Sequence, residues 1–357
     1  MRIALDATPL SVSTGGIRRY TEELARALAG EFPGDDFRLI SDQTFSFSGP
    51  APGNLKLITS RPLNVMERRW WLMGVQREMS RSRIDVFHGT DFSVPYLALR
   101  PSVLTLHDLS PWMDPRWHHA ARRVRVRTPF LIRNGRATMV ITPSETVRRQ
   151  AIEKFALDAG QVVAIPEAAP AWMSPTENVD SAAEPYFLYV GTLEPRKNIP
   201  TIISAWRRVK ECAPVSLVLA GRRRSDFPAL EDEPGLRILG EVPDADLPGL
   251  FSGAVAVLYP SLYEGFGLPV LEAMTCGAAV VTSCDPAILE VSGGAAIHVG
   301  ADDENGWVTQ MRNLLSNPVE REDRKARSLE RAVQFSWRKT AILTREVYAE
   351  AIRRFEQ

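Results

Sequence analysis

The sequence predicts an α/β protein made of two Rossmann-like domains whose parallel sheets face each other across a cleft. Short β-branched or aliphatic runs alternate with stretches of helical apolar period, which is typical of parallel sheets covered by helices on both faces. Residues 168–185 contain three prolines among small polar residues and show no periodicity, so they indicate a linker. The 357 residues suffice for two domains, with 45% apolar and 24% charged residues as in globular proteins.

The first domain is expected to span residues 1–170. Its candidate strands are residues 2–6, 37–40, 85–88, 103–107, 139–142 and 162–165. The helix after the first strand has an apolar face formed by Ile17, Tyr20, Leu24 and Leu28. Ser144 follows the fifth strand, where it is placed to cap the next helix.

The second domain is expected to span residues 185–335. Its candidate strands are residues 187–190, 216–220, 237–239, 254–259 and 278–282. Its first helix has an apolar face formed by Ile199, Ile202, Ile203, Trp206 and Val209. A final helix is predicted at residues 337–355, with Ser336 as its cap.

Charge and cysteine content exclude several classes of protein. Lysine plus arginine and aspartate plus glutamate both number 43, so no net charge favours a nucleic-acid partner. The three cysteines show no C-x-x-C pair and no zinc spacing, which disfavours disulfide scaffolds and structural zinc. We predict no signal peptide and no apolar run of about 18 residues. The expected location is therefore the cytoplasm, with peripheral attachment to the inner face of the cell membrane left open.

The strongest functional signal follows the fourth predicted strand of the second domain. Pro269 suits the first turn of a helix, and Gly265 and Gly267 allow close approach of the backbone to a ligand. The helix N-terminus then offers N–H groups to a phosphate. Glu264 lies before this helix and Glu272 one turn inside it, and two carboxylates at one turn fit sugar hydroxyls. The alternative is a glycine-rich turn with a solvated glutamate.

Two further loops carry candidate anion-binding groups. Arg196 and Lys197 follow the first strand of the second domain, where adjacent cations suit a diphosphate. A solvated basic turn is the alternative. Gly15 and Gly16 precede the first helix and can bring backbone N–H groups to an anion. They do not form G-x-G-x-x-G, so a dehydrogenase is disfavoured and an ordinary flexible loop is the alternative.

Histidines end two strands of the first domain. His107 closes the fourth predicted strand and His88 the third, so both are expected at the carboxyl edge of the sheet. A hydrogen-bonded buried histidine is the alternative for each. Asp244 and Asp246 have the D-x-D form of a metal site, but helical apolar spacing follows them, so we interpret them as a helix cap and expect no metal.

A basic segment lies between Arg116 and Arg136. It holds seven arginines and no acidic residue, with Trp117 and Phe130 among them. Basic and aromatic residues together suit an anionic membrane surface or a diphosphate lipid. A solvated charged helix is the alternative.

These motifs together resemble glycosyltransferase family 4, a group of retaining enzymes with the GT-B fold. The resemblance is carried by Glu264 and Glu272 as an E-x7-E pattern, Arg196-Lys197, Gly15-Gly16, His107-Asp108 and the tail Phe335-Ser336-Trp337. It covers essentially the whole chain. Residues 191–198 are also similar to bacterial mannosyltransferases of surface polysaccharide and lipopolysaccharide biosynthesis. The resemblance implies an acceptor-binding first domain, a second domain that binds a nucleotide-diphosphate sugar, and a helix at about 340–357 that packs back on the first domain.

The resemblance also implies roles for residues of the second domain. Lys197, with Arg196, neutralises the donor diphosphate, and Glu272 holds the ribose hydroxyls. Glu264 contacts the donor sugar. Backbone groups that support the sugar and phosphate are those of Gly265, Phe266, Gly267 and Leu268. Val242 borders the base.

In the first domain the resemblance places Gly15 and Gly16 by the β-phosphate and His107 by the transferred sugar. The implied reaction moves a hexose, such as mannose from GDP-mannose, to a glycan or a polyprenyl-diphosphate-linked acceptor without a metal or another cofactor. Cations and helix N-termini would stabilise the charge that grows on the leaving diphosphate. No carboxylate is placed to attack the sugar, so we expect same-face attack with the leaving phosphate accepting the proton.

The chain departs from the family pattern at two places. Thr192 stands where many relatives have arginine, and Glu167-Ala168 replaces the usual glycine after the last strand of the first domain. Two other functions stay open: a nucleotide-sugar epimerase of the same fold, and a non-catalytic partner that binds sugar nucleotides. Transfer of sugar to an acceptor would separate the enzyme of our prediction from both.

Overall fold

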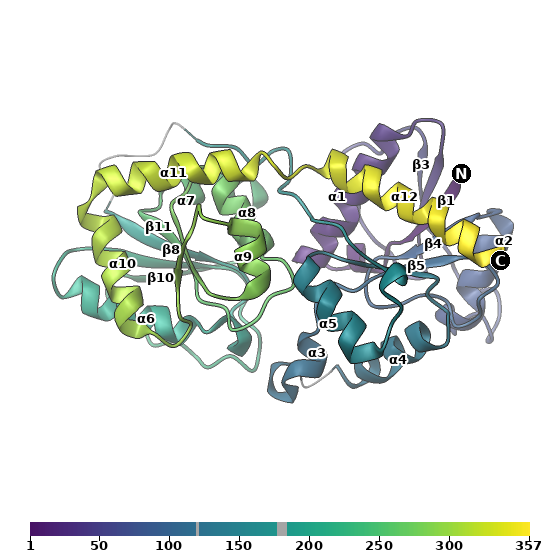
Figure 1. The fold of residues 1–357 in the computed structure, drawn as a ribbon, viewed down its shortest axis with the longest axis horizontal. Helices are drawn as coiled ribbons and strands as arrows, with labels where there is room; N and C mark the ends of the chain where they lie inside the picture. The colour runs from purple at the N-terminus through teal and green to yellow at the C-terminus, as the bar shows by residue number, and fades with distance from the viewer. Residues whose placement is uncertain (119–120, 177–183) are drawn as a thin grey trace. The chain divides into compact units, whose positions relative to one another are not determined.

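The computed structural model describes residues 1–118, 121–176 and 184–357 (Figure 1). The described residues form two compact units. The first contains Met1–Glu167 and Ser336–Gln357, and the second contains Ala168–Phe335. Each unit is built around one sheet of parallel strands, which confirms the predicted α/β class with two Rossmann-like domains.

In the described part of the first unit, the sheet has seven strands in the order β3-β2-β1-β4-β5-β6-β7. The strands are β1 (Arg2–Asp6), β2 (Asp36–Ser41), β3 (Leu55–Thr59), β4 (Val86–Gly89), β5 (Ser102–Thr105), β6 (Met139–Thr142) and β7 (Val162–Ala164). The helices are α1 (Gly16–Glu31), α2 (Val75–Arg81), α3 (Ser110–Met113), α4 (Arg122–Arg133), α5 (Glu145–Phe155) and α12 (Trp337–Phe355). Short helical turns are Thr8–Ser11, Trp70–Gly74, Pro115–Trp117 and Ala159–Gln161.

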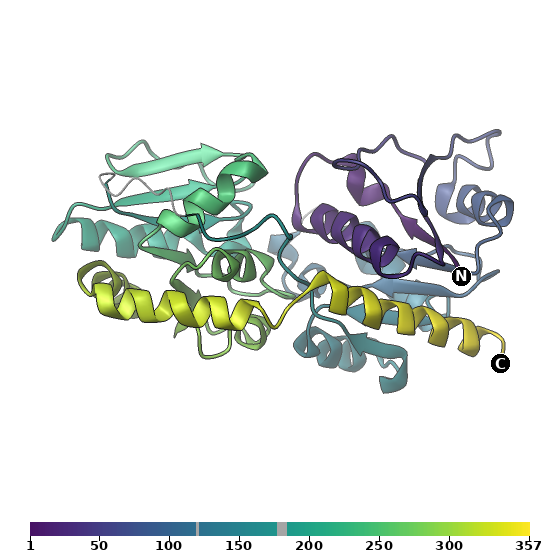
Figure 2. The same ribbon diagram turned by 90° about the horizontal axis from the view of Figure 1, so that it is seen from above.

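Helix α12 belongs to the first unit, although it ends the chain. It packs beside α1 and against β4, β5 and β6 (Figure 2). The Tyr348 hydroxyl lies 2.7 Å from Nδ1 of His88 in this interface, and His88 also lies 2.7 Å from the Thr105 hydroxyl. His88 is therefore a buried, hydrogen-bonded histidine. The predicted caps are confirmed, because Ser336 accepts from the Lys339 N–H and Ser144 from the Val147 N–H.

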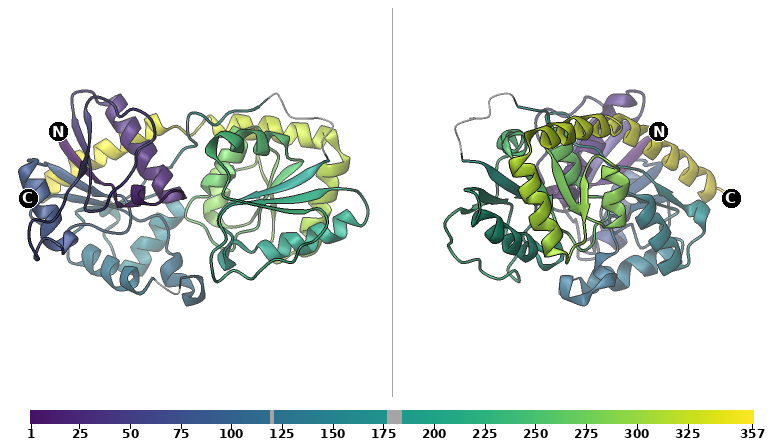
Figure 3. Two further views of the ribbon diagram at one scale, coloured as in Figure 1. Left: turned by 180° about the vertical axis from the view of Figure 1, so that it is seen from behind. Right: turned by 60° about the vertical axis from the view of Figure 1, so that its left-hand side comes forward.

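The described sheet of the second unit has six strands in the order β10-β9-β8-β11-β12-β13. The strands are β8 (Tyr186–Val190), β9 (Ser216–Ala220), β10 (Leu236–Gly240), β11 (Ala256–Tyr259), β12 (Val280–Ser283) and β13 (Ile297–Val299). The helices are α6 (Ile199–Lys210), α7 (Leu247–Gly253), α8 (Leu268–Thr275), α9 (Pro286–Ser292), α10 (Glu304–Ser316) and α11 (Pro318–Ala332), with short turns Pro195–Lys197 and Asp244–Asp246. Helix α10 packs on α6, and α11 packs on α8 (Figure 3).

Two edge strands were not predicted from the sequence. β3 lies at one edge of its sheet, and three of its five side chains are exposed, so it lacks the continuous apolar run of a buried parallel strand. β13 is an edge strand of three residues. The prediction also extended β5 too far, because it ends at Thr105 and leaves His107 in the following loop.

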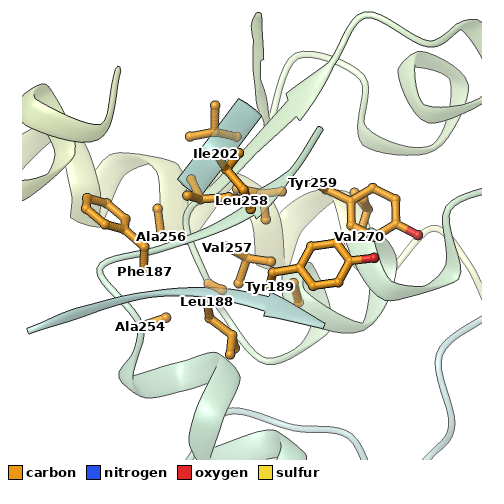
Figure 4. Packing of buried hydrophobic residues seen from close by; sticks show 14 of the residues in the cluster. Phe187, Leu188, Tyr189, Ile202, Ala254, Ala256, Val257, Leu258, Tyr259 and Val270 are labelled. Atoms are coloured by element: carbon orange, nitrogen blue, oxygen red, sulfur yellow. The ribbon is translucent and has the colours of Figure 1, made fainter. Parts of the chain in front are cut away.

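The core of the second unit places two tyrosines beneath the carboxyl edge of its sheet. β8 and β11 are central neighbours whose apolar residues are buried. Tyr189 is the second-to-last residue of β8, and Tyr259 is the last residue of β11. Their rings stack with centroids 6.0 Å apart, and both hydroxyls point the same way (Figure 4). The polar ends of these rings therefore meet the loops that follow the strands.

Candidate active site

The two loops after β8 and β11 form the centre of the candidate site. β8 leads to the turn Pro195–Lys197, and β11 leads through residues 260–267 into α8. Because the two strands are adjacent and parallel, both loops emerge at the same edge of the sheet. The N–H of Leu262 donates to the carbonyl of Arg196 over 2.9 Å and joins the loops.

Three residues predicted as catalytic meet between these loops. Nζ of Lys197 lies 2.5 Å from Oε1 of Glu264, and Nη1 of Arg196 lies 3.0 Å from Oε2 of the same carboxylate. Lys197, Arg196 and Glu264 are only 7%, 7% and 6% exposed. Lys197 also donates to the hydroxyl of Tyr259 over 2.8 Å. The cations are thus held rigidly, in contact with the carboxylate.

The ion-pair network continues away from Glu264. Nη2 of Arg196 lies 2.9 Å from Oε1 of Glu194, whose other oxygen lies 2.7 Å from Nη1 of Arg224. Arg224 in turn contacts Asp226. Each guanidinium is therefore held between two carboxylates, and Arg196 cannot swing toward a ligand without leaving one of them.

Electrostatics keep Glu264 ionised. Burial alone would raise the pKa of its carboxyl, but the charges of Lys197 and Arg196 outweigh this and hold the pKa at about 2. Burial lowers the pKa of Lys197, and Glu264 opposes that shift. Burial and the charge of Glu264 raise the pKa values of the Tyr189 and Tyr259 phenols well above their usual range. At neutral pH Glu264 is therefore ionised, and the phenols of Tyr189 and Tyr259 are neutral.

This arrangement leaves limited capacity for an anion. The ammonium group of Lys197 has three N–H donors, of which Glu264 and Tyr259 accept two. The third is suited to a phosphate oxygen. A diphosphate that binds to both cations would compete with Glu264, which already contacts each of them. The sequence predicted Lys197 and Arg196 as phosphate ligands but did not show that a neighbouring carboxylate already engages both.

The start of α8 has the predicted local structure. Gly267 caps the helix in the left-handed conformation (φ 95°), and a Cβ there would also lie 3.4 Å from Ile288. Leu268 and Pro269 form the first turn, as the position of the proline predicts. Glu272 lies within α8 and is 2% exposed, so it is a buried carboxylate near the site loop.

The loop that carries Glu264 is held from the neighbouring strand. Asp285 follows β12, and its Oδ2 accepts from the N–H of Glu264 over 3.2 Å. Its Oδ1 accepts from the N–H groups of Ala287 and Ile288 at the start of α9. Burial raises the pKa of Asp285 to about 6, against the effect of these hydrogen bonds. Asp285 therefore couples the Glu264 loop to α9.

The remaining predicted residues of the second unit lie around this centre. Gly265 and Phe266 are in the same loop, and the Phe266 ring packs edge-on against Phe335 with centroids 6.0 Å apart. Val242 lies after β10 and lines an open pocket of about 560 Å³. Leu239 and Leu250 give this pocket apolar walls, and Glu241 adds a carboxylate.

Residues of the first unit that were predicted as functional lie at the carboxyl side of its own sheet. Gly15 caps α1 with φ 134°, Gly16 is the first residue of α1, and a Cβ on either would meet no atom within 4 Å. The start of α1 is therefore open, as an anion site would require. His107 follows β5 and is 9% exposed. Nδ1 of His107 lies 3.4 Å from Oε1 of Glu167, the residue that departs from the family pattern.

The seven arginines of the basic segment do not form one free charged face. Arg116 pairs with Asp114 at 2.6 Å, Arg125 donates to the His118 carbonyl, and Arg127 lies over the Trp71 ring at 5.8 Å. Arg122 and Arg123 are the first two residues of α4, and both side chains are exposed. No helix among the described residues has the length and apolar character needed to cross a membrane.

The D-x-D motif begins a helix, but not through the predicted cap. Asp244 and Asp246 form a short turn before α7, and Asp246 occupies the N-cap position. In this described segment its side chain makes no cap hydrogen bond, so the cap prediction is wrong in that detail. The described residues contain no cluster of three or more histidine, cysteine, aspartate or glutamate side chains arranged to hold a metal.

Sequence comparison places this geometry in a known family. The family model described as Glycosyltransferase Family 4 matches residues 14–171, and the one described as Glycosyl transferases group 1 matches residues 184–317. O-antigen chain mannosyltransferase B of Escherichia coli is 30% identical, over 98% of this chain and 99% of that protein. The chain belongs to glycosyltransferase family 4. It is a glycosyltransferase, as the sequence predicted.

Other relatives agree with this assignment. O-antigen chain mannosyltransferase RfbU of Salmonella typhimurium is 29% identical over 64% of each chain. The solved structure of sucrose-phosphate synthase from Thermosynechococcus elongatus has a TM-score of 0.78 at 18% identity, covering 98% of both chains. WaaG, a glycosyltransferase involved in lipopolysaccharide biosynthesis, has a TM-score of 0.71 at 14% identity, over 97% of this chain and 98% of that chain. These structures confirm the GT-B fold of family 4 glycosyltransferases.

Sequence reasoning missed several residues that shape the site. Glu194 lies inside the predicted motif and was not singled out, although its position beside Arg196 was available. Asp285 stands in an Asp-Pro pair after a strand, which is a recognisable helix-cap signal. The roles of Tyr259 and Glu167 depend on contacts 62 and 60 residues away along the chain, to Lys197 and His107 respectively, and no local pattern reports them.

Proposed function

We propose that this glycosyltransferase is a retaining mannosyltransferase of surface polysaccharide or lipopolysaccharide biosynthesis. It moves mannose from GDP-mannose to a glycan or polyprenyl-diphosphate-linked acceptor. The observation that carries the proposal is the 30% identity with an O-antigen chain mannosyltransferase over 98% of this chain. A second named mannosyltransferase, RfbU, points in the same direction.

The cluster of the second unit supplies chemistry that such a reaction needs. The glycosyl–phosphate bond breaks with negative charge growing on the leaving diphosphate, and preorganised cations stabilise that charge. Lys197 offers its third N–H to the diphosphate, and Arg196 adds positive charge behind it. Glu264, ionised at neutral pH, accepts hydroxyl groups of the mannose, and Glu272 accepts those of the ribose.

The proposed reaction retains the configuration of the sugar. The acceptor hydroxyl attacks the face from which the diphosphate leaves, and the leaving phosphate oxygen takes the acceptor's proton. No metal or other cofactor takes part, since protein cations neutralise the diphosphate. His107 and the Gly15–Gly16 backbone are proposed to contact the sugar and the β-phosphate.

A direct experiment tests donor and reaction together. Thermal shifts are measured with GDP, UDP, ADP and dTDP, because a ligand that binds only the folded state raises the melting temperature. GDP is expected to give the largest shift, and GDP-mannose to label a polyprenyl-diphosphate-linked glycan. A larger shift with UDP overturns the GDP-mannose assignment. Conversion of the nucleotide sugar without transfer identifies an epimerase, and binding without any reaction identifies a non-catalytic partner.

The first unit carries a surface suited to a lipid-linked acceptor. Helix α4 exposes Arg122 and Arg123 together with Val126 (69%) and Phe130 (47%). The turn Trp70–Gly74 packs against α4 through Trp71, and the segment before that turn exposes Leu63, Val65 and Met66. Arginines beside exposed apolar side chains match an anionic lipid surface, where each cation contributes about 1 kcal/mol. We therefore propose a cytoplasmic enzyme attached peripherally to the inner face of the cell membrane.

Vesicle sedimentation tests this surface. The protein is expected to sediment with phosphatidylglycerol vesicles, not with phosphatidylcholine vesicles, and to be released by high salt. Arg122→Ser/Arg123→Ser should reduce sedimentation. Arg222→Ser/Arg223→Ser removes the same charge from an exposed arginine pair of the second unit and should not. Equal sedimentation with both lipids, or with both variants, contradicts the proposal.

A further inference from the structure

A buried glutamate and histidine face each other at the carboxyl side of the first unit's sheet. His107 lies two residues beyond β5, and Glu167 lies three residues beyond β7. His107 is 9% exposed and Glu167 is 6% exposed. Glu167 belongs to the pair Glu167-Ala168, which stands where the family pattern has its usual glycine.

The contacts of the imidazole determine where its protons lie. Nε2 of His107 lies 2.8 Å from the carbonyl oxygen of Thr90, which can only accept a hydrogen bond, so Nε2 carries a hydrogen. Nδ1 lies 3.4 Å from Oε1 of Glu167. A neutral ring with its hydrogen on Nε2 would turn the lone pair of Nδ1 toward a carboxylate. A hydrogen on Nδ1 replaces that repulsion by attraction, and the pair then consists of an imidazolium and a carboxylate.

Aromatic neighbours fix the plane of the ring. Tyr20 meets His107 edge-on, with centroids 4.8 Å apart at 89°, and Phe92 lies 6.2 Å away at 68°. The imidazole therefore cannot flip to exchange its two nitrogens without moving these rings. Its orientation depends on keeping an acceptor on each side.

The surrounding charges favour the charged form of His107. Burial lowers the pKa of the imidazole, but Glu167 and then Asp91 raise it more, and the net shift is upward. His88 stays neutral, because burial and the nearby His107 charge lower its pKa to about 3. Burial raises the pKa of Tyr20, so that neighbour is neutral as well. Glu167 is thus the counter-charge in direct contact with the ring.

We propose that Glu167 is a positioning residue, that it forms a neutral ion pair with His107, and that this pair sets the pH range of sugar transfer. The proposal rests on the proposed function, in which His107 lies beside the transferred mannose. A lone imidazolium there would repel the positive charge that develops on the sugar. A neutral imidazole would lose its hold on Glu167. The pair keeps the ring oriented and adds no net charge.

The experiment compares wild type with Glu167→Gln, which keeps the shape of the side chain and removes its charge. Histidine ¹⁵N resonances are followed against pH, and His107→Asn assigns the His107 signal. His107 in wild type is expected to stay doubly protonated above pH 6.5. In Glu167→Gln its proton dissociation constant should rise about tenfold or more, as expected when an opposite charge in contact is lost. Glu153→Gln makes the same change at an exposed site of α5 and should leave the titration unchanged.

The kinetic arm follows kcat for mannosyl transfer against pH. The alkaline limb of the profile is expected to move to lower pH in Glu167→Gln by the shift seen in the His107 titration, with little change in KM for GDP-mannose. Glu167→Asp keeps the carboxylate, so its alkaline limb should lie closer to that of wild type. If Glu167→Gln does not fold, Glu167→Asp is compared with wild type in its place. An unchanged His107 titration overturns the ion pair. A moved titration with an unchanged pH profile overturns its role in transfer. If wild type transfers no mannose, the proposed function fails, and the titration still decides the ion pair.

Discussion

Replacing Glu264 by glutamine tests the buried charge cluster most directly. The substitution keeps the shape of the side chain and removes the charge that faces Lys197 and Arg196. The pKa of Glu264 is held at about 2 in the fold, against 4.5 for an unperturbed glutamate. At about 1.4 kcal/mol for each pH unit, the ionised carboxylate contributes about 3 kcal/mol to stability. This agrees with the ~3–5 kcal/mol expected when one partner of a buried ion pair is removed.

The pH dependence has a definite sign. The folded-state pKa is depressed, so the stabilisation is fully present above pH 4.5 and is lost as the pH falls toward 2. Urea denaturation at pH 7 should therefore show Glu264→Gln to be less stable by about 3 kcal/mol, and the difference should shrink below pH 4.5. Glu233→Gln is the matched control, because Glu233 pairs with Arg207 and Lys210 in a more exposed network. That control should lose no more than about 1 kcal/mol.

Although Glu264→Gln should be less stable than wild type, it should not bind the diphosphate of GDP more weakly. Glutamine keeps one acceptor oxygen, so the substitution releases one of the two N–H donors of Lys197 and Arg196 that Glu264 occupies. Calorimetry is expected to show GDP binding at least as tight as in wild type, although mannosyl transfer is lost. Unchanged stability at pH 7 would mean that the ion pairs contribute nothing. Loss of GDP binding in a folded variant would mean that these cations are not diphosphate ligands.

Three further predictions concern the same site. Glu272→Ala should weaken GDP binding about tenfold or more by calorimetry, because charge-assisted hydrogen bonds to the ribose are worth ~1.5–3 kcal/mol; unchanged affinity would remove Glu272 from the ribose. Lys197→Ala should lower kcat far more than it changes KM, since the charge on the leaving diphosphate is greatest in the transition state. A kcat equal to that of wild type would show that Lys197 does not stabilise the leaving diphosphate. Transfer should survive EDTA, and a loss reversed by Mg²⁺ would make Asp244 and Asp246 metal ligands.

The elements that hold the site could be predicted because their signals are local. A short run of buried, mostly aliphatic residues marks β6 and β9 at their observed bounds, and glycine with proline marks the start of α8. The edge strands β3 and β13 lack such runs, because an edge strand need not be apolar on both faces. The fold of the site was therefore more predictable than the rims of the sheets.

The electrostatic state of the site was not predictable in the same way. Lys197 and Glu264 stand 67 residues apart, and their sequence neighbours indicate only that both lie on loops at one sheet edge. The contact between these two side chains depends on the pairing of β8 with β11 and on Asp285, which follows β12 and holds the Glu264 loop. The contacts of the seven arginines in the basic segment were not predictable either. The sequence shows their charge, but it does not show that Arg125 donates to a backbone carbonyl or that Arg127 lies over the Trp71 ring.

The Glu167-Ala168 pair shows that the role of a family residue must be argued from the contacts that it makes in this chain. A carboxylate buried at 6% exposure is costly unless a cation or several hydrogen bonds meet it. His107 can be that cation only if its other nitrogen already donates, as it does to Thr90. A chain without a carboxylate at this position would have no such constraint, so its histidine would be free to be neutral. The role of His107 in this chain therefore cannot be taken from the family without Glu167.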